Sequence, residues 1–575
     1  MARLPLLTNG PHAARLFPSL TPEQIARIAS HGVTRRITRG EVLIEEGETD
    51  VPFFVIQSGE IEIVRPSSLG DLVIAANGPG KFTGEVSMIL DRPAMMRLRV
   101  SEPGEVVELT REQMHTLIQT DAEISEILMK ALIYRRVELV AHGIGDVLLV
   151  GSARSAATLR VKEFLTRNGH PFNYLDLDRD AEVRGLLDHF HVAATDTPVL
   201  ICRGDAVLRN PSNQEVADHL GFNVRIDRDH RRDIVIVGAG PAGLAAAVYA
   251  ASEGLDALVI EASSPGGQAG SSSRIENYLG FPTGISGQEL AGRAYAQAQK
   301  FGADVMIARS AVALARDRGT CVVTLDDGAS IVARAVVIAT GARYRKPPLA
   351  NLEQFEGAGV YYSATFMEAQ LCDAADVIVV GGANSAGQAA VFLARTARQV
   401  HLLVRADTLS ASMSQYLVRR LEESRNIRIR TRTEVVGLDG TGHLERVQWR
   451  DETGAITTHD IRHVFLMTGA EANTAWLEGR VALDPQGFIK TGPDLTPEDL
   501  DAGRWPLTRA PYALETSLPG VFAVGDVRCG NVKRVASAVG EGSIAISFVH
   551  RALGERPAVT QGEPDRRGLP LQTIR

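Results

Sequence analysis

The segment DIVIVGAGPAGLAAAVYAASEGLDALVIE, at 233–261, combines residue types and spacing that suit dinucleotide binding. Gly238, Gly240 and Gly243 follow an apolar, β-branched run and open an Ala-rich segment that is typical of a helix. Glycines in this spacing allow a tight turn, close approach of the backbone to a pyrophosphate, and close packing of helix on strand. Glu261 ends the second apolar run, where an acid can accept hydrogen bonds from ribose hydroxyls. We therefore predict an adenine dinucleotide site at this turn.

A second pattern of the same kind lies further along the chain, in VIVVGGANSAGQAA at 377–390. Ala383 stands where the second glycine of the pattern is expected, and its methyl group crowds the approach of a pyrophosphate. The sequence thus predicts two dinucleotide sites, of which the first is intact and the second is weakened.

Length, charge and cysteine usage exclude several classes of protein. The 575 residues predict about four domains, and a net charge of −8 gives no basic footprint for nucleic acid. There is no apolar run long enough to cross a bilayer, and the N-terminus lacks the apolar region of a signal peptide. Cys202, Cys321, Cys372 and Cys529 form no C-x-x-C. We therefore expect a cytoplasmic protein without a disulfide framework, a metal site or a membrane partner.

The first 143 residues predict a small β-roll followed by helices. Short β-rich runs alternate with glycine turns, and an apolar-periodic segment over 111–140 predicts one or two helices. This layout resembles a cyclic-nucleotide-binding domain, with F-x-G-E at Phe82–Glu85 opening the phosphate cassette.

That resemblance implies an arginine directly after the cassette proline, to neutralise the cyclic phosphate. Here Ala94 follows Pro93, and the nearest arginines, Arg92 and Arg97, are displaced. Cyclic nucleotide binding and a dimerising or docking role are therefore both open for this domain.

Residues 144–228 predict a β-α-β-α-β-α series that includes a helix near 180–190. The series resembles a thioredoxin or glutaredoxin fold, with Thr197-Pro198 at its cis-proline turn. Chemistry in that family needs a thiolate at the N-terminus of the first helix, where Ser155 and Thr158 stand here. The resemblance implies a domain without thiol–disulfide exchange, and we expect Cys202 to be a buried, unreactive residue.

The remaining chain carries further short motifs that fit a known superfamily. They are Gly266-Gly267-Gln268, the segment Ile275–Pro282, VVIATGA at 336–342, LPGVFAVGD at 518–526 and a helix entered through Arg534-Val535-Ala536. Together with the two glycine turns, these pieces resemble the low-molecular-weight thioredoxin reductases within the two-dinucleotide-binding flavoproteins.

The resemblance implies an FAD-binding domain at 229–342 and 469–575, interrupted by an NAD(P)H-binding domain at 343–468. The expected fold class is multidomain α/β: a β-roll with helices, a thioredoxin/glutaredoxin-like α/β domain, then two nested dinucleotide-binding three-layer domains. The residues expected to bind cofactor are Gly238, Gly240, Pro241, Ala242, Gly243, Glu261, Gly267, Gln268, Asn277, Thr340, Gly341, Gly382, Asn384, Ser385, Ala386, Arg405, Gly525, Asp526, Val535 and Ala536.

The chain departs from that family at the dithiol. Ser363 and Phe366 stand where the resemblance places the two sulfurs, so no catalytic side chain is expected beside the flavin. Cys372 cannot cycle alone between dithiol and disulfide. Cys529 follows the Gly525-Asp526 turn; a place near the cofactor and a structural role are both open.

The nicotinamide end also departs from the family. NADPH-dependent relatives have two arginines after the strand that follows the second turn, and this chain has Val404-Arg405-Ala406. One arginine without an acid favours NADPH over NADH, although Arg405 is equally explained as a surface residue. The connection at 493–517, Pro-rich and Trp-bearing, is expected to cover the flavin face or an interdomain groove.

The leading hypothesis is therefore an FAD-dependent NAD(P)H oxidoreductase. Hydride would pass from the nicotinamide to flavin N5, and electrons would leave to an external acceptor such as a small redox protein or a quinone. A ferredoxin or flavodoxin reductase is one alternative, and a nucleotide- or redox-sensing regulatory flavoprotein with little turnover is another. The resemblance also implies a homodimer.

Overall fold

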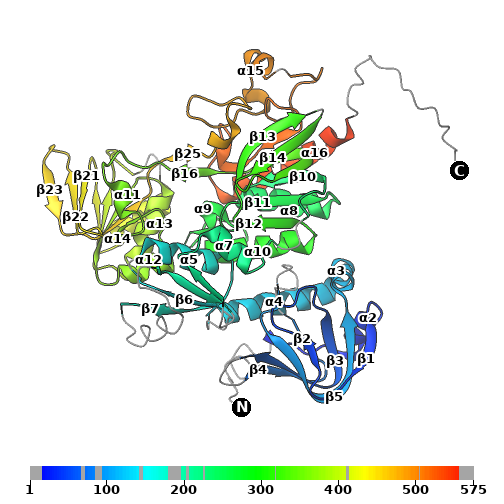
Figure 1. Ribbon diagram of the computed structural model, residues 1–575. Helices are drawn as coiled ribbons and strands as arrows, with labels where there is room; N and C mark the ends of the chain where they lie inside the picture. The colour runs from blue at the N-terminus through cyan, green and yellow to red at the C-terminus, as the bar shows by residue number, and fades with distance from the viewer. Residues whose placement is uncertain are drawn as a thin grey trace.

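The computed structural model describes residues 16–66, 71–84, 93–141, 147–153, 155–178, 196–202, 206–223, 227–272, 274–317, 319–409, 413–503 and 505–555. They form an N-terminal domain, a middle domain, and an outer domain into which an inner domain is inserted (Figure 1). The predicted helix near 180–190 lies outside the described residues.

The N-terminal domain is an antiparallel sheet closed off by helices. Its strands follow the order β1-β5-β3-β4, with β2 paired to β5. The predicted helical segment is two helices, because the backbone of Asp121 is extended and ends α3. The elements are α2 (Pro22–Ala29), β1 (Val33–Ile37), β2 (Val42–Ile44), β3 (Phe53–Arg65), β4 (Leu72–Asn77), β5 (Arg97–Leu109), α3 (Arg111–Thr120) and α4 (Ala122–Ala141).

The middle domain is a small mixed sheet with the order β7-β6-β8-β9, in which only β6 and β7 are parallel. The Thr197-Pro198 bond before β8 is cis, as expected. Helix α5 begins after Ser155, whose hydroxyl accepts from the Thr158 N–H. The elements are β6 (Val147–Gly151), α5 (Ala156–Arg167), β7 (Phe172–Asp176), β8 (Val199–Cys202), β9 (Ala206–Arg209) and α7 (Asn213–His219).

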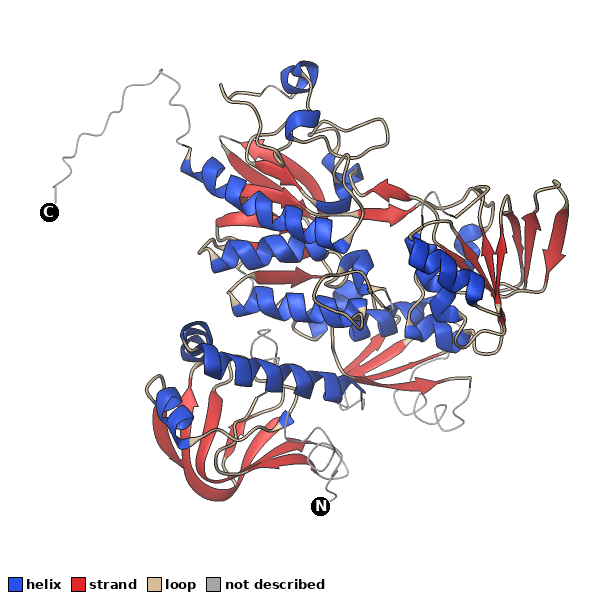
Figure 2. Ribbon diagram, turned by 180° about the vertical axis from the view of Figure 1, so that it is seen from behind, coloured by secondary structure: helices blue, strands red, loops and turns tan. Residues whose placement is uncertain are grey.

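The outer domain is built on a sheet of order β12-β11-β10-β15-β14-β13, with β26 paired to β15. Its central strands are parallel and apolar, and α8, α10 and α16 pack together on one face (Figure 2). The elements before the insertion are β10 (Arg232–Val237), α8 (Pro241–Ser252), β11 (Ala257–Glu261), α9 (Gly267–Gly270), α10 (Gly287–Lys300), β12 (Asp304–Ile307), β13 (Ala311–Asp317), β14 (Thr320–Leu325) and β15 (Ser330–Ile338). Those after it are η3 (Ala475–Leu477), η4 (Gly492–Asp494), α15 (Pro497–Ala502), β26 (Val521–Ala523), η5 (Gly525–Val527) and α16 (Val535–Gly554).

The inner domain repeats the parallel plan with the order β17-β24-β18-β19-β20, and it adds an antiparallel sheet β21-β22-β23. The chain enters and leaves it through one antiparallel ribbon of β16 (Ala342–Tyr344) and β25 (Ala470–Ala472). The other elements are α11 (Leu352–Phe355), β17 (Val360–Tyr361), α12 (Phe366–Leu371), β18 (Asp376–Val380), α13 (Asn384–Leu393), β19 (Gln399–Leu403), α14 (Gln415–Glu423), β20 (Ile427–Arg430), β21 (Glu434–Asp439), β22 (Arg446–Arg450), β23 (Ile456–His459) and β24 (His463–Leu466).

One continuous cluster of buried apolar residues runs from the N-terminal sheet through the middle domain into the outer domain. The inner domain has two cores of its own, one on each side of its parallel sheet. Within the described ranges, no helix combines the length and apolarity needed to span a membrane.

Candidate dinucleotide site

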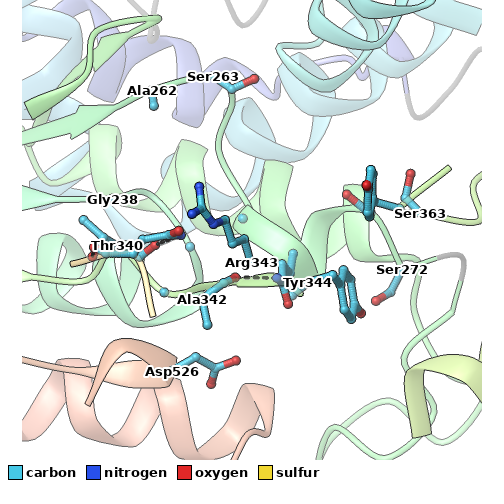
Figure 3. Close-up of a pocket in the computed structure, with 18 of the residues that line it drawn as sticks. Gly238, Ala262, Ser263, Ser272, Thr340, Ala342, Arg343, Tyr344, Ser363 and Asp526 are labelled. Carbon is cyan, nitrogen blue, oxygen red and sulfur yellow. Dashed lines mark hydrogen bonds between the residues drawn. The ribbon is translucent and has the colours of Figure 1, made fainter. Parts of the chain in front are cut away.

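A cleft of about 1300 Å³ opens between the outer and inner domains, at the carboxyl ends of their parallel strands. Figure 3 shows part of its wall, with Gly238 and Thr340 at one end of the view and Ser363 and Ser272 at the other. Most of the predicted site residues line this cleft: Gly238, Gly240, Pro241, Ala242, Glu261, Gly267, Gln268, Asn277, Thr340, Gly341, Asn384, Ser385, Gly525, Asp526 and Val535. The predicted residues that do not line it are Gly243, Gly382, Ala386, Arg405 and Ala536.

The first glycine turn leaves no room for side chains on the protein side. Gly238 has a φ of +107°, and a Cβ there would overlap the carbonyl oxygen of Ala339. A Cβ on Gly243 would overlap the carbonyl oxygen of Gly238, because α8 begins directly against β10. A Cβ on Gly240 would meet only Gly267 at 3.9 Å, so this residue faces open space. The turn is thus closed toward the protein and open toward the cleft.

The N-terminus of α8 is free of side-chain capping. Its N-cap is Gly240, and no side chain accepts from its first-turn N–H groups. In contrast, Ser155 caps α5 and Ser286 caps α10. Uncapped N–H groups and the helix dipole together favour an anion such as a pyrophosphate. The geometry of this turn fits the diphosphate of a dinucleotide.

Glu261 lies at the end of β11, beside the same turn. Its carboxylate accepts hydrogen bonds from the N–H groups of Ala239 at 2.8 Å, Ser263 at 2.9 Å and Ser264 at 3.2 Å. Burial raises the pKa of Glu261, and these donors together with the charge of Arg167 act in the opposite direction. The acid is therefore fixed in orientation at the edge of the cleft, where a ribose is expected.

Gly525 and Asp526 line the cleft next to the first glycine turn, since a Cβ on Gly525 would lie 2.9 Å from the Cβ of Ala242. Glu541 of α16 holds this turn, since it accepts from the Gly525 N–H at 2.7 Å and from Arg528 at 2.6 Å. Burial raises the pKa of Asp526, which Lys533 counteracts and Glu541 reinforces. Glu541 belongs to no sequence motif of the site, although it lies in the helix that is entered through Arg534-Val535-Ala536.

The turn at Thr340 and Gly341 is held by Asn473 from beyond the insertion. The Thr340 hydroxyl donates to the Asn473 carbonyl, and the Asn473 amide donates to the Thr340 carbonyl, both at 2.9 Å. Gln268 donates to the carbonyl of Ala342 at the start of the β16 ribbon. These contacts fix the floor of the cleft at the crossover between the two domains.

The second turn keeps the backbone of the first but not its glycines. A Cβ on Gly381 would overlap the Met467 carbonyl oxygen, so glycine is required there. Ala383 is the N-cap of α13, which has no side-chain cap, and its methyl is exposed. Ser385 lines the cleft, whereas Arg405 is exposed two residues after β19 ends.

Tyr344 was missed by the sequence analysis, although it follows the predicted turn at 336–342 directly. It lines the cleft from β16, and its hydroxyl hydrogen-bonds with Ser385 of the second turn. Burial raises its pKa, the bond to Ser385 lowers it, and the charge of Asp526 raises it further. Tyr344 therefore contacts the second nucleotide turn and lies near enough to Asp526 for the charge of that carboxylate to raise its pKa.

Of the two predicted dithiol positions, one lines the cleft, and neither carries a thiol. Ser363 lines the wall and Phe366 begins α12. All four cysteines are in the described part of the chain, are free, and do not line the cleft. Cys372 and Cys202 are buried, and burial raises the pKa of Cys372 to about 12. Cys529 is half-buried, and its N–H donates to Ile489 away from the cleft.

Two further expectations concern regions outside the nucleotide turns. The connection at 493–517 does not line the cleft. Instead Arg509 pairs with Glu515 at 2.6 Å and with Glu555 at 2.5 Å, which fastens the connection to the end of α16. In the N-terminal domain, Arg97 pairs with Glu45 at 2.8 Å. Glu85 and Arg92 lie outside the described residues.

Comparisons with known proteins agree with this geometry. Residues 232–542 match the family described as pyridine nucleotide-disulphide oxidoreductase, and residues 34–121 match the cyclic nucleotide-binding domain. A thioredoxin reductase of Mycolicibacterium smegmatis is 34% identical over 330 residues, which are 56% of this chain and 97% of that protein. A thioredoxin reductase of Streptomyces coelicolor is 33% identical, over 58% of this chain and 98% of that protein.

The fold is also that of a solved enzyme. The crystal structure of T. acidophilum thioredoxin reductase superimposes with a TM-score of 0.50 and 28% identity, and the match covers 57% of this chain and 100% of that one. The expected fold class is confirmed: a multidomain α/β protein with a β-rich N-terminal domain and a nested dinucleotide-binding fold. With more than half of its length matched, this chain belongs to the pyridine nucleotide-disulphide oxidoreductase family.

Proposed function

We propose that this protein is an FAD-dependent NAD(P)H oxidoreductase that delivers electrons to an external acceptor without an internal dithiol. Its family, in the branch that resembles thioredoxin reductase, uses FAD and NADPH. FAD, when bound, supplies a two-electron acceptor for the hydride of NAD(P)H. One observation carries the proposal: Ser363 lines the cleft, and none of the four cysteines does.

Different residues of the cleft would bind different parts of the two nucleotides. The turn from Gly238 to Gly243 would hold the FAD diphosphate at the uncapped end of α8, and Glu261 would hold the ribose. Asp526 and Val535 would face the flavin end. Ser385 and the uncapped end of α13 would hold the nicotinamide nucleotide.

Tyr344 would orient the two sites rather than transfer a proton. Because burial raises its pKa above the ordinary value, the hydroxyl stays protonated at neutral pH. A protonated hydroxyl bonded to Ser385 can fix the second turn relative to the Asp526 end of the cleft. It would thereby set how closely a nicotinamide can approach the flavin.

Anaerobic mixing of the purified holoprotein with NADPH, followed by flavin absorbance, tests the proposal. We expect prompt bleaching, reoxidation by a quinone, and no turnover of thioredoxin disulfide. The matched variant carries Ser363→Cys and Phe366→Cys together, which supplies the spacing of a C-x-x-C dithiol. If the wild-type protein reduces thioredoxin disulfide with NADPH alone, the proposed absence of a relay is wrong. Flavin that stays oxidised with NADPH and NADH would instead support a regulatory flavoprotein.

Ligand sensing by the N-terminal domain is a second candidate, which Arg135 of α4 favours. Its guanidinium donates to the carbonyls of Phe82 at 3.2 Å and Gly84 at 2.6 Å, at the start of the predicted cassette. It also lies over the rings of Phe17 and Phe82, at 4.7 Å and 4.6 Å from their centroids. A ligand that moved the cassette would therefore act directly on α4, which leads toward the middle domain.

Calorimetric titration of the full chain with cyclic AMP and cyclic GMP tests this second candidate. Heat that saturates, and that is lost in Arg135→Met, would support it. Absence of heat at millimolar ligand would leave the N-terminal domain as a docking or dimerising module.

A further inference from the structure

The middle domain docks on the outer domain at the carboxyl ends of β11 and β12. Asn223 exchanges two hydrogen bonds with the backbone of Ile307, both at 2.8 Å. The two carboxylate oxygens of Asp218 accept from Nη2 of Arg309, at 2.7 Å and 2.9 Å. These contacts surround the end of the sheet where Glu261 lies, because the Arg309 N–H donates to the Glu261 carbonyl.

Helix α5 of the same domain forms part of the cleft wall. Its residues Ala156, Leu159, Arg160, Glu163 and Arg167 line the cleft at helical spacing. Arg160 is held within its own domain by Asn213 at 2.9 Å and by the Pro211 carbonyl at 2.7 Å. The wall therefore contains Arg160, whose guanidinium is hydrogen-bonded within the middle domain, and a second arginine about two helical turns further.

That second arginine, Arg167, contacts Gly267, which lies beside the first nucleotide turn. It donates to the carbonyl of Gly267 at 2.8 Å and more weakly to Glu163 at 3.3 Å. Its Nε is buried and has no hydrogen-bond partner, while the side chain as a whole is 17% exposed. Gly267 in turn lies against Gly240, and the charge of Arg167 acts on Glu261. Because the Nε is not exposed to the cleft, a ligand there would accept from the terminal Nη groups of Arg167.

We propose that Arg167 binds the adenosine-diphosphate half of FAD, and that the middle domain thereby completes the flavin site. The diphosphate is anionic and the ribose carries hydroxyl oxygens. A guanidinium presents its donors in a planar fork that suits both groups. Arg167 bonds to Gly267, which lies against Gly240, and its charge acts on Glu261, so it lies where the diphosphate and ribose are expected. A domain without thiols at Ser155 and Thr158 would then serve as a structural part of the cofactor site.

The inference shares with the proposed function only the presence of FAD in the cleft. Its test is FAD affinity, measured by fluorescence after the flavin has been removed from the full-length protein. We expect Arg167→Met to weaken FAD binding on the order of tenfold to a hundredfold, as for a lost charge-assisted hydrogen bond. Calorimetry with ADP on the apoprotein should show the same loss, while riboflavin binding should not change.

Gln288→Ala is the matched control, because it weakens the docking of the middle domain without altering the cleft. Gln288 donates to the Thr166 carbonyl at 3.0 Å, next to Arg167. We expect this variant to bind FAD within about twofold of the wild type. Equal losses in Gln288→Ala and Arg167→Met would show that Arg167 only docks the domain, and would overturn the inference.

Arg167→Lys is a second variant, which keeps the test valid if Arg167→Met fails to fold. It keeps the charge but loses the planar fork, so we expect FAD binding to be weaker than in Gln288→Ala by about fivefold or more. FAD binding by Arg167→Lys equal to that of Gln288→Ala would overturn the inference. Wild-type protein that binds no FAD would overturn the proposed function, whereas wild-type binding that Arg167→Met retains would overturn only this inference.

Discussion

The two nucleotide turns of this chain have the same backbone plan and different side chains. Both follow a buried parallel strand, and both helices start after an extended N-cap without a side-chain cap. The outer turn has glycine at Gly238, Gly240 and Gly243, but the inner turn keeps only Gly381 before Ala383 and Ala386. The first glycine of each turn, Gly238 or Gly381, cannot accept a Cβ without overlap, whereas the third position is Gly243 in the outer turn and Ala386 in the inner one.

The difference separates what the fold requires from what the ligand requires. Gly238 and Gly381 are forced by a neighbouring carbonyl, so the chain cannot close the turn without them. Gly240 and Ala383 face open space, so a methyl group at this position affects the ligand rather than the fold. We therefore expect the inner site to bind its nucleotide more weakly while the inner domain folds normally.

The largest expected effect comes from Gly243→Ala. The new methyl would overlap the Gly238 carbonyl, and such overpacking costs roughly 1–3 kcal/mol of stability or more. FAD content after gel filtration and the melting temperature should both fall. Ala386→Gly, at the corresponding inner position, should cost only about 0.5–1 kcal/mol and leave FAD content unchanged. Full FAD content in Gly243→Ala would remove the distinction between the two turns.

Acidification should affect the inner domain before the outer one. Burial lowers the pKa of His401 and of His463 to about 4, so the unfolded chain binds more protons than the native chain between pH 6.5 and about 4. The two neutral histidines therefore do not reduce the free energy of unfolding above pH 6.5. They reduce it progressively as pH falls toward 4. At pH 5 each would cost about 1 kcal/mol, given that both rings keep some solvent contact.

The two acids of the outer site change the free energy of unfolding in the opposite direction as pH falls. Burial raises the pKa of Glu261 and of Asp526, so their protonation as pH falls favours the native apoprotein. Hydrogen exchange at pH 7 and pH 5 should therefore show protection lost first in β19 and β24. Earlier loss in β10 or β11 would contradict this order.

Arg405→Ala should affect one nicotinamide nucleotide and not the other. A lost charge-assisted bond to a 2′-phosphate costs about 1.5 kcal/mol or more, hence about tenfold in NADPH affinity. NADH affinity should not change, and neither should FAD content. Arg398→Ala is the control, since Arg398 is an exposed arginine of the same domain that pairs with Asp376 at 2.8 Å. Equal losses for NADPH and NADH would show that Arg405 is a surface residue.

The smallest expected effect is a gain of function in Ala383→Gly. Glycine is preferred to alanine at an N-cap, and the variant also opens the approach of the pyrophosphate, together worth about 0.5–1 kcal/mol. NADPH should bind about two- to fivefold more tightly in a titration of flavin reduction. Weaker binding in this variant would mean that the Ala383 methyl contributes to the site.

Local patterns predicted the turns and the elements around them, because each depends on residues that are neighbours in sequence. Arg167 and Tyr344 could not be found that way. Arg167 meets Gly267 one hundred positions later in the chain, and Tyr344 of β16 meets Ser385 of α13, a separate element of the inner domain. Closeness in sequence can also mislead: Cys529 follows Asp526 by three residues, yet it does not line the cleft.

The predicted domain limits remain predictions. The first, at 143/144, falls in segment 142–146, which lies outside the described residues, and the second, at 228/229, falls just after segment 224–226, which also lies outside them. Limited proteolysis of the full chain would test whether cleavage falls there. The limits of the inner domain lie close to the β16 and β25 ribbon, whose strands pair at Ala342 and Ala472.

Helix α5 has a consequence for motion. Its first residue, Ala156, lies against Gly357 of the inner domain, Leu159 packs on the inner core, and Arg167 bonds to Gly267 of the outer domain. The inner domain is also joined to the outer one by the pair of Arg420 with Glu276 at 2.7 Å and by the β16 and β25 ribbon, about which a nested domain could swivel as a rigid body. With α5 bridging both bodies, any swivel must slide or break one end of that helix contact, so the middle domain limits the angles available.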